Sequence, residues 1–117
     1  MKKNFGFTDY LIQKEKKQRK FFQNYLKYAK EIKKVAQKEL GKVRVIVFGS
    51  VLKKEEVPQD IDILVISPKF NDYKKRRELL CKMWRKFGDF SPFEFHLITP
   101  DDYKEWYKNF IKEKIEV

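Results

Sequence analysis

Three short runs of apolar and β-branched residues constrain the fold of this chain more than any other feature. The runs cover residues 43–48, 61–66 and 93–98. Each has the length of a typical strand and is too short for an independent helix. Helical patterns precede the first run, separate the second from the third, and follow the third. This order predicts an α/β (α+β) fold with one sheet covered by helices.

The helical patterns are amphipathic. From Phe21 to Leu40 apolar residues recur every three or four positions, and Gly41 ends the pattern. A second helix is expected over residues 72–87, and a third opens at Thr99 with proline at its first position. Trp84, Trp106 and Tyr107 stand at helical spacing with other apolar residues, so we expect them in the core.

The connection between the first two strands is short. Residues 49–59 leave little room for the crossover helix that a parallel pair requires. We therefore expect a mixed sheet rather than a purely parallel one.

The chain is strongly basic, and the excess charge lies near its beginning. Residues 1–40 carry 12 Lys and Arg against 4 Asp and Glu, a balance of +8 out of a total of +11. We predict a basic helical extension over residues 1–20, followed by the main domain over residues 21–117. Such an extension attracts nucleic acid through counterion release. The alternative is a solvated lysine-rich surface of the kind common in thermophilic proteins.

Length and cysteine content limit the number of domains and the cellular compartment. The 117 residues correspond to one ordinary domain, and the lone Cys81 has no partner for an internal disulfide. The first residues lack the apolar core of a secretory signal, and no run approaches the ~18 apolar residues that span a bilayer. We expect a cytoplasmic protein with no membrane segment.

Acidic residues on two predicted strands suggest a metal site. Asp60 and Asp62 stand two positions apart, so on a strand their side chains project to the same face. Alternation places Glu94 on one face of the third strand together with His96. Carboxylate pairs suit Mg²⁺, which takes one or two carboxylates together with substrate phosphates. With Glu94 as a third ligand, a two-ion site becomes feasible.

A turn after the first strand suggests a phosphate site. Gly49 would let the backbone approach a phosphate closely, and Ser50 with nearby N–H groups could hold the terminal phosphates. Lys53 and Lys54 follow and could neutralise triphosphate charge, although lysines in a loop are often only solvated. A glycine and serine after a strand are, by themselves, most often a simple turn.

These residues together resemble a known signature. Phe48-Gly-Ser, nine further residues, and Asp60-Ile-Asp62-Ile-Leu-Val look like the motif of the DNA polymerase β-like nucleotidyltransferase superfamily. Within it the chain is similar to the minimal nucleotidyltransferases of bacteria and archaea, over about residues 20–112. The resemblance implies that Gly49 and Ser50 bind triphosphate, that Asp60 and Asp62 bind metal, and that Glu94 is the third acidic residue.

The resemblance also implies an activity. We expect a Mg²⁺-dependent enzyme that transfers an NMP unit, with ATP the favoured donor, to a hydroxyl of a protein or nucleic-acid acceptor. Similar proteins often work beside a helical partner protein as antitoxins of a two-gene pair. The alternative is an inactive module that keeps the fold to bind a partner. A homodimer is expected if the first or last helix leaves an apolar face exposed.

Two further features allow two interpretations each. His96 could assist proton transfer from an acceptor hydroxyl, or it could be a hydrogen-bonded residue of the sheet. The basic run 74–77 could contact a nucleic-acid backbone, or it could be the solvated start of a helix.

Overall fold

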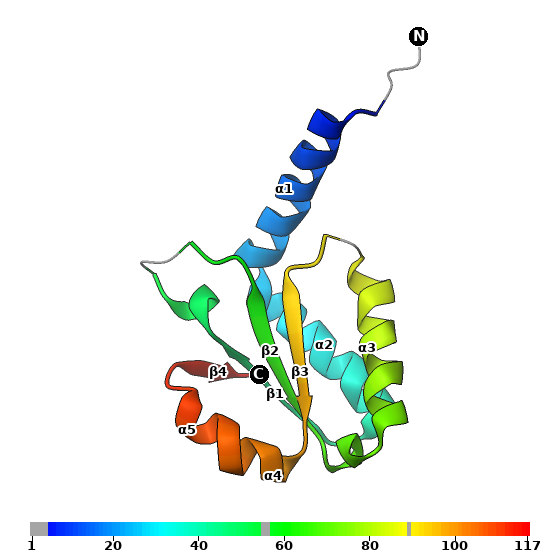
Figure 1. The fold of residues 1–117 in the computed structure, drawn as a ribbon, viewed down its shortest axis with the longest axis vertical. Helices are drawn as coiled ribbons and strands as arrows, with labels where there is room; N and C mark the ends of the chain where they lie inside the picture. Colours follow the sequence, from blue (N-terminus) through cyan, green and yellow to red (C-terminus); the bar gives the residue numbers. More distant parts are fainter. Residues whose placement is uncertain (1–4, 55–56, 89) are drawn as a thin grey trace.

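The fold is seen in a computed structural model that describes residues 5–54, 57–88 and 90–117 of the chain (Figure 1). In chain order the elements are α1 (Phe7–Gln23), α2 (Tyr25–Leu40), β1 (Arg44–Phe48), η1 (Ser50–Leu52), β2 (Ile61–Ile66), η2 (Pro68–Asn71), α3 (Tyr73–Phe87), β3 (Phe93–Ile98), α4 (Pro100–Asp102), η3 (Tyr103–Tyr107), α5 (Lys108–Phe110) and β4 (Lys114–Glu116). None of the helices formed by these described residues is both long enough and apolar enough to cross a membrane.

The strands form one mixed sheet, as predicted. Its order is β3-β2-β1-β4, with β1 antiparallel to β2 and to β4, and β2 parallel to β3. The short connection after β1 permits only the antiparallel pairing, whereas α3 provides the crossover between the parallel strands β2 and β3. β4 was not predicted, since three residues carry too little pattern to identify a strand.

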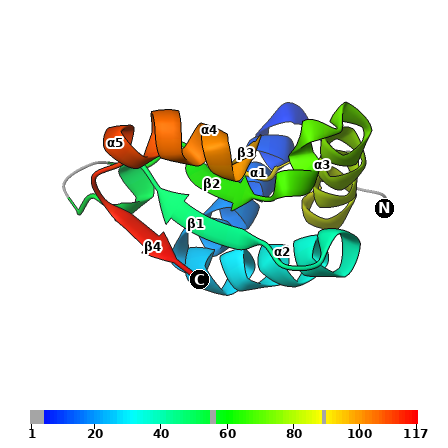
Figure 2. The same cartoon turned by 90° about the horizontal axis from the view of Figure 1, so that it is seen from below.

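Helices cover both faces of the sheet (Figure 2), and each face has its own apolar core. On one face α2 and α3 pack against strand residues such as Val45 and Ile63, and Met83 of α3 enters the same core; all three are fully buried. On the other face the C-terminal helical segment α4-η3-α5 packs through Tyr103 and Tyr107. This second cover leaves part of its face open, since the side chain of Glu94 on β3 is exposed there.

The predicted helix over residues 21–40 is interrupted at Asn24. The residue has φ −122°, and its side-chain Nδ2 donates a hydrogen bond of 2.9 Å to the Lys20 carbonyl. Asparagine competes in this way for backbone groups, which separates α1 from α2. α1 contains no buried residue and projects away from the sheet (Figure 1). The proposed boundary between residues 20 and 21 falls inside α1 and stays a prediction; residues 1–4 lie outside the described part.

The expectation that both tryptophans are core residues was wrong. Trp84 is 59% exposed and Trp106 is 72% exposed. In α3 the buried positions are Leu79 and Met83, and Trp84 lies about 100° further around the helix. In the last helical segment Tyr103 and Tyr107 take the inward positions, so Trp106 faces solvent.

Candidate active site

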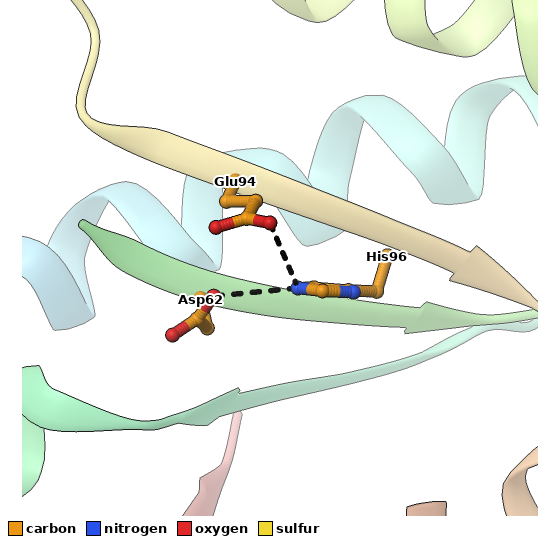
Figure 3. A group of neighbouring side chains, drawn as sticks. All are labelled: Asp62, Glu94 and His96. Atoms are coloured by element: carbon orange, nitrogen blue, oxygen red, sulfur yellow. Dashed lines mark hydrogen bonds and ion pairs between the residues drawn. The ribbon is translucent and has the colours of Figure 1, made fainter.

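Asp62, Glu94 and His96 come together on the open face of the sheet (Figure 3). One ligand atom from each lies within 4.8 Å of the others. The His96 Nε2 atom is 3.3 Å from Asp62 Oδ1 and 4.0 Å from Glu94 Oε1. The side chains of Asp62 and His96 are mostly buried, whereas that of Glu94 is 57% exposed. The group therefore has one open side, toward Glu94.

The register of the strands creates this group. Asp62 of β2 stands beside Glu94 of β3 in the parallel pair, and it also stands opposite Phe48 of β1. Since neighbouring residues on a strand face opposite ways, Ile61 and Ile63 enter the core behind the sheet and leave Asp62 on the open face. The alternation that the sequence predicted for Asp62, Glu94 and His96 is therefore the observed one.

Gly49 packs directly against the Asp62 carboxylate. Its φ of +87° and ψ of −158° lie in a region that only glycine occupies readily. A Cβ atom at this position would lie 2.3 Å from Asp62 Oδ2 and 3.2 Å from its Cγ. The sequence interpretation assigned Gly49 to phosphate approach alone; the structure adds that the absence of a side chain makes room for Asp62.

A pocket lined by both charged and apolar residues extends from this point. It has a volume of about 430 Å³, and Gly49, Lys53 and Asp62 line it together with Phe110 and Lys112. Ser50 is half-buried at the start of η1 and accepts a backbone hydrogen bond of 3.0 Å from Lys53 N. Lys54 is exposed in the following turn. The pocket brings Lys53 and Lys112 near two carboxylates, Asp62 and Glu113, and a glycine turn, an arrangement suited to an anionic ligand with a bound cation.

Asp60 does not join the group. It is exposed and lies one residue before β2 begins. Because it is outside the strand, alternation along β2 does not fix the direction of its side chain. Its assignment as a metal ligand stays a prediction.

His96 is a hydrogen-bonded sheet residue, one of the two interpretations considered for it. Its ring also lies 5.2 Å from that of Phe48 and 6.0 Å from that of Tyr107, measured between ring centroids. These contacts fix the ring on both sides. His96 can therefore hold the Asp62 carboxylate in place or add a nitrogen ligand.

The donor atoms fit a divalent cation. Two carboxylates supply the hard oxygen ligands that Mg²⁺ prefers, and the exposed side near Glu94 leaves positions for phosphate oxygens or water. The imidazole would additionally suit Mn²⁺ or Zn²⁺ better than an all-oxygen site would.

Sequence reasoning missed several residues around the group. Lys112 and Phe110 line the pocket beside Gly49, and Trp106 lies nearby on the same C-terminal segment. The aromatic residues Trp106 and Phe110 are four positions apart, and this spacing was a usable signal for a shared helix face. That this face borders the sheet rather than entering the core depends on tertiary packing.

Comparisons with known proteins agree with this geometry. A family model described as "Nucleotidyltransferase domain" matches residues 27–116. A crystal structure provisionally described as that of a nucleotidyltransferase superimposes with a TM-score of 0.66 and 33% sequence identity, covering 77% of this chain and 97% of the other. No curated protein matches the chain.

Proposed function

The chain belongs to the nucleotidyltransferase domain family, and we propose that it is a Mg²⁺-dependent enzyme that transfers an NMP unit from an NTP to a hydroxyl group. One observation carries the proposal: Asp62 and Glu94 meet on the open face of the sheet, beside a glycine turn and a pocket lined by lysine. A purely structural pair of carboxylates would not need this anion-binding surrounding.

Each residue has a distinct role in the proposed reaction. Asp62 and Glu94 would hold the cation, with Asp60 completing the site from the exposed segment before β2. The chemistry that Mg²⁺ supplies when bound is neutralisation of the triphosphate and polarisation of the α-phosphate. The Gly49 and Ser50 turn, with Lys53 and Lys54, would bind the β- and γ-phosphates. His96 positions the Asp62 carboxylate through its hydrogen bond.

The transfer step is an in-line substitution at the α-phosphorus. The acceptor oxygen forms a bond to the α-phosphorus while the bond to the bridging α–β oxygen breaks, and pyrophosphate leaves. The acceptor proton passes to a carboxylate, and Glu94 suits this task because it is the most exposed of the three side chains. ATP as donor, and hence AMP as the transferred unit, is part of the proposal.

The acceptor is proposed to be a macromolecule. The described part of the chain forms a single sheet with its covers and an open face, and the resemblance to minimal nucleotidyltransferases suggests a helical partner protein, with the chain as the antitoxin of a two-gene pair. A nucleic-acid acceptor is the alternative, and the basic α1 supports it.

Label transfer tests the proposal. Wild-type protein, Asp62→Ala and Glu94→Gln are each incubated with Mg²⁺, a lysate of the source organism, and ATP labelled at the α- or the γ-phosphate. Relative to the lysate alone, we expect wild type to add macromolecular label from α-labelled ATP but not from γ-labelled ATP, and both variants to add none. Protease or nuclease sensitivity then identifies the acceptor class. An increase in label from γ-labelled ATP above that of the lysate alone, or undiminished transfer by Asp62→Ala, would contradict nucleotidyl transfer at this site.

A binding module without catalytic activity is the second candidate. The position of Asp60 outside the group formed by Asp62, Glu94 and His96 favours it. This candidate predicts that a partner protein is captured equally well by wild type and by Asp62→Ala, with no transfer of label by either protein.

A further inference from the structure

The C-terminal helical segment exposes large aromatic side chains beside the acidic group. Trp106 is 72% exposed and Phe110 is 79% exposed. Together with Phe48, His96 and Tyr107 they line a pocket of about 460 Å³. Exposed aromatic residues that gather around one hollow usually mark a binding surface rather than chance exposure.

This aromatic pocket adjoins the proposed triphosphate pocket. Phe48 and Phe110 line both hollows. His96 connects the aromatic pocket to the metal site, since its ring contacts Phe48 and Tyr107 while its Nε2 atom faces Asp62. A ligand that extends from one hollow to the other would therefore meet charged groups at one end and aromatic faces at the other.

A nucleoside triphosphate has this combination in one molecule. Its phosphates suit the pocket with Gly49, Lys53 and Lys112, and its base is a flat ring that stacks on aromatic side chains. The acceptor suits the aromatic pocket less well than the base does. The base is covalently linked to the triphosphate and must lie near it, whereas an aromatic group of the acceptor need not. If the base lies in the aromatic pocket, a single nucleotide fills both hollows, which share Phe48 and Phe110.

We propose that the pocket formed by Phe48, His96, Trp106, Tyr107 and Phe110 binds the nucleobase of the donor nucleotide, with Trp106 and Phe110 as the stacking residues. The inference rests on the proposed function, since it assumes that the neighbouring pocket holds the triphosphate. It adds a nucleoside-binding surface formed by the C-terminal segment, outside the glycine turn and the acidic residues.

Two probes separate the base from the phosphates. α,β-Methylene-ATP carries both parts and cannot be cleaved between its α- and β-phosphates, whereas inorganic tripolyphosphate has no base. Binding of each is measured calorimetrically with Mg²⁺ for wild type, Trp106→Ala and Phe110→Ala. The matched control is Trp84→Ala, which removes another exposed tryptophan from α3, on the opposite cover of the sheet.

We expect Trp106→Ala and Phe110→Ala to weaken binding of the nucleotide by about five- to 150-fold, which corresponds to the loss of one base-stacking contact. Affinity for tripolyphosphate should not change, and Trp84→Ala should affect neither probe. In a Trp84→Phe background, where Trp106 is the remaining tryptophan, the nucleotide should quench fluorescence and tripolyphosphate should not.

Different failures have different meanings. Equal affinity of wild type for both probes, with no loss in Trp106→Ala, would overturn the base pocket and leave the triphosphate site intact. A Trp106→Ala variant with normal nucleotide affinity but a raised KM for the acceptor would also overturn it and assign the pocket to the acceptor. Failure of wild type to bind either probe would contradict the proposed function and this inference with it.

Discussion

Gly49 and Asp62 act as one unit at the scale of single residues. The carboxylate occupies the space where a side chain of residue 49 would be, and the backbone at Gly49 has a positive φ. The sequence identified both residues through the alternation of β2 and the turn after β1. It did not indicate that they touch, because that contact depends on the antiparallel register between β1 and β2.

Gly49→Ala is predicted to inactivate the protein. The new Cβ would force the Asp62 carboxylate to move, which disturbs the metal site, and the unfavourable backbone conformation would cost about 1 to 3 kcal/mol of stability. Activity is measured by label transfer and stability by thermal unfolding.

Gly41→Ala is the matched control for this substitution. Gly41 has a similar φ of +78°, but no atom lies within 4 Å of the position its Cβ would take. It should lose comparable stability and keep its activity. Equal activity in both variants would show that the contact between Gly49 and Asp62 has no functional role.

At the scale of elements, local pattern predicted the long strands and helices, and tertiary contacts determined the rest. The runs that became β2 and β3 have the predicted bounds. β4 was missed because its three exposed residues are held by pairing with β1 rather than by a pattern of their own. The acidic group followed from strand alternation, whereas the aromatic pocket depends on how the C-terminal segment crosses the sheet.

An ion pair links β4 to β1. Arg44 donates hydrogen bonds of 2.8 and 2.9 Å to the Glu116 carboxylate. Hydrogen bonding to Arg44 is the main cause that lowers the pKa of Glu116 below 4.5, with the charges of Arg44, Lys33 and Lys114 adding to it against the opposing effect of burial. Because the pKa is lower in the folded protein, the pair stabilises the fold above pH 4.5 and stops doing so as the pH falls through the lowered value.

Glu116→Gln should therefore be less stable than wild type at pH 7 and approach it in acid. The loss should be about 1 kcal/mol or less, because both side chains are exposed to solvent screening. Denaturant unfolding from pH 7 to pH 3 measures the difference, with Glu105→Gln, at an exposed position of η3, as control. A difference that grows as the pH falls would contradict this account of the pair.

At the scale of the whole molecule, α1 stands apart from the rest. The molecule measures 57 × 35 × 20 Å, and α1 extends along its longest direction (Figure 1). Its last turn is anchored because Phe21 packs against Tyr28, Phe87 and Phe93. The preceding residues 1–20 carry 7 Lys and Arg against 2 Asp and Glu.

Removing residues 1–20 is predicted to leave the sheet folded and to weaken binding of nucleic acid. Phe21 and its aromatic contacts remain in the shortened chain, so thermal unfolding should stay cooperative. Affinity for a labelled RNA oligonucleotide should fall, and its dependence on salt should become shallower, because fewer phosphates are neutralised.

A control for the position of the charge replaces Lys74 and Lys75 of α3 with glutamine in the full chain. It removes two positive charges away from α1 and should keep most of the affinity and most of the salt dependence. RNA affinity unchanged by the truncation would exclude α1 as the binding surface.

We propose that Asp62 and Glu94 hold the cation through which the nucleotide binds. Electron paramagnetic resonance of Mn²⁺, used in place of Mg²⁺, tests it by counting free and bound ions for wild type and for Asp62→Asn. We predict that wild type binds Mn²⁺ more tightly when α,β-methylene-ATP is present, and that Asp62→Asn loses this binding while its thermal unfolding stays cooperative. Equal Mn²⁺ binding by the two proteins would contradict the claim.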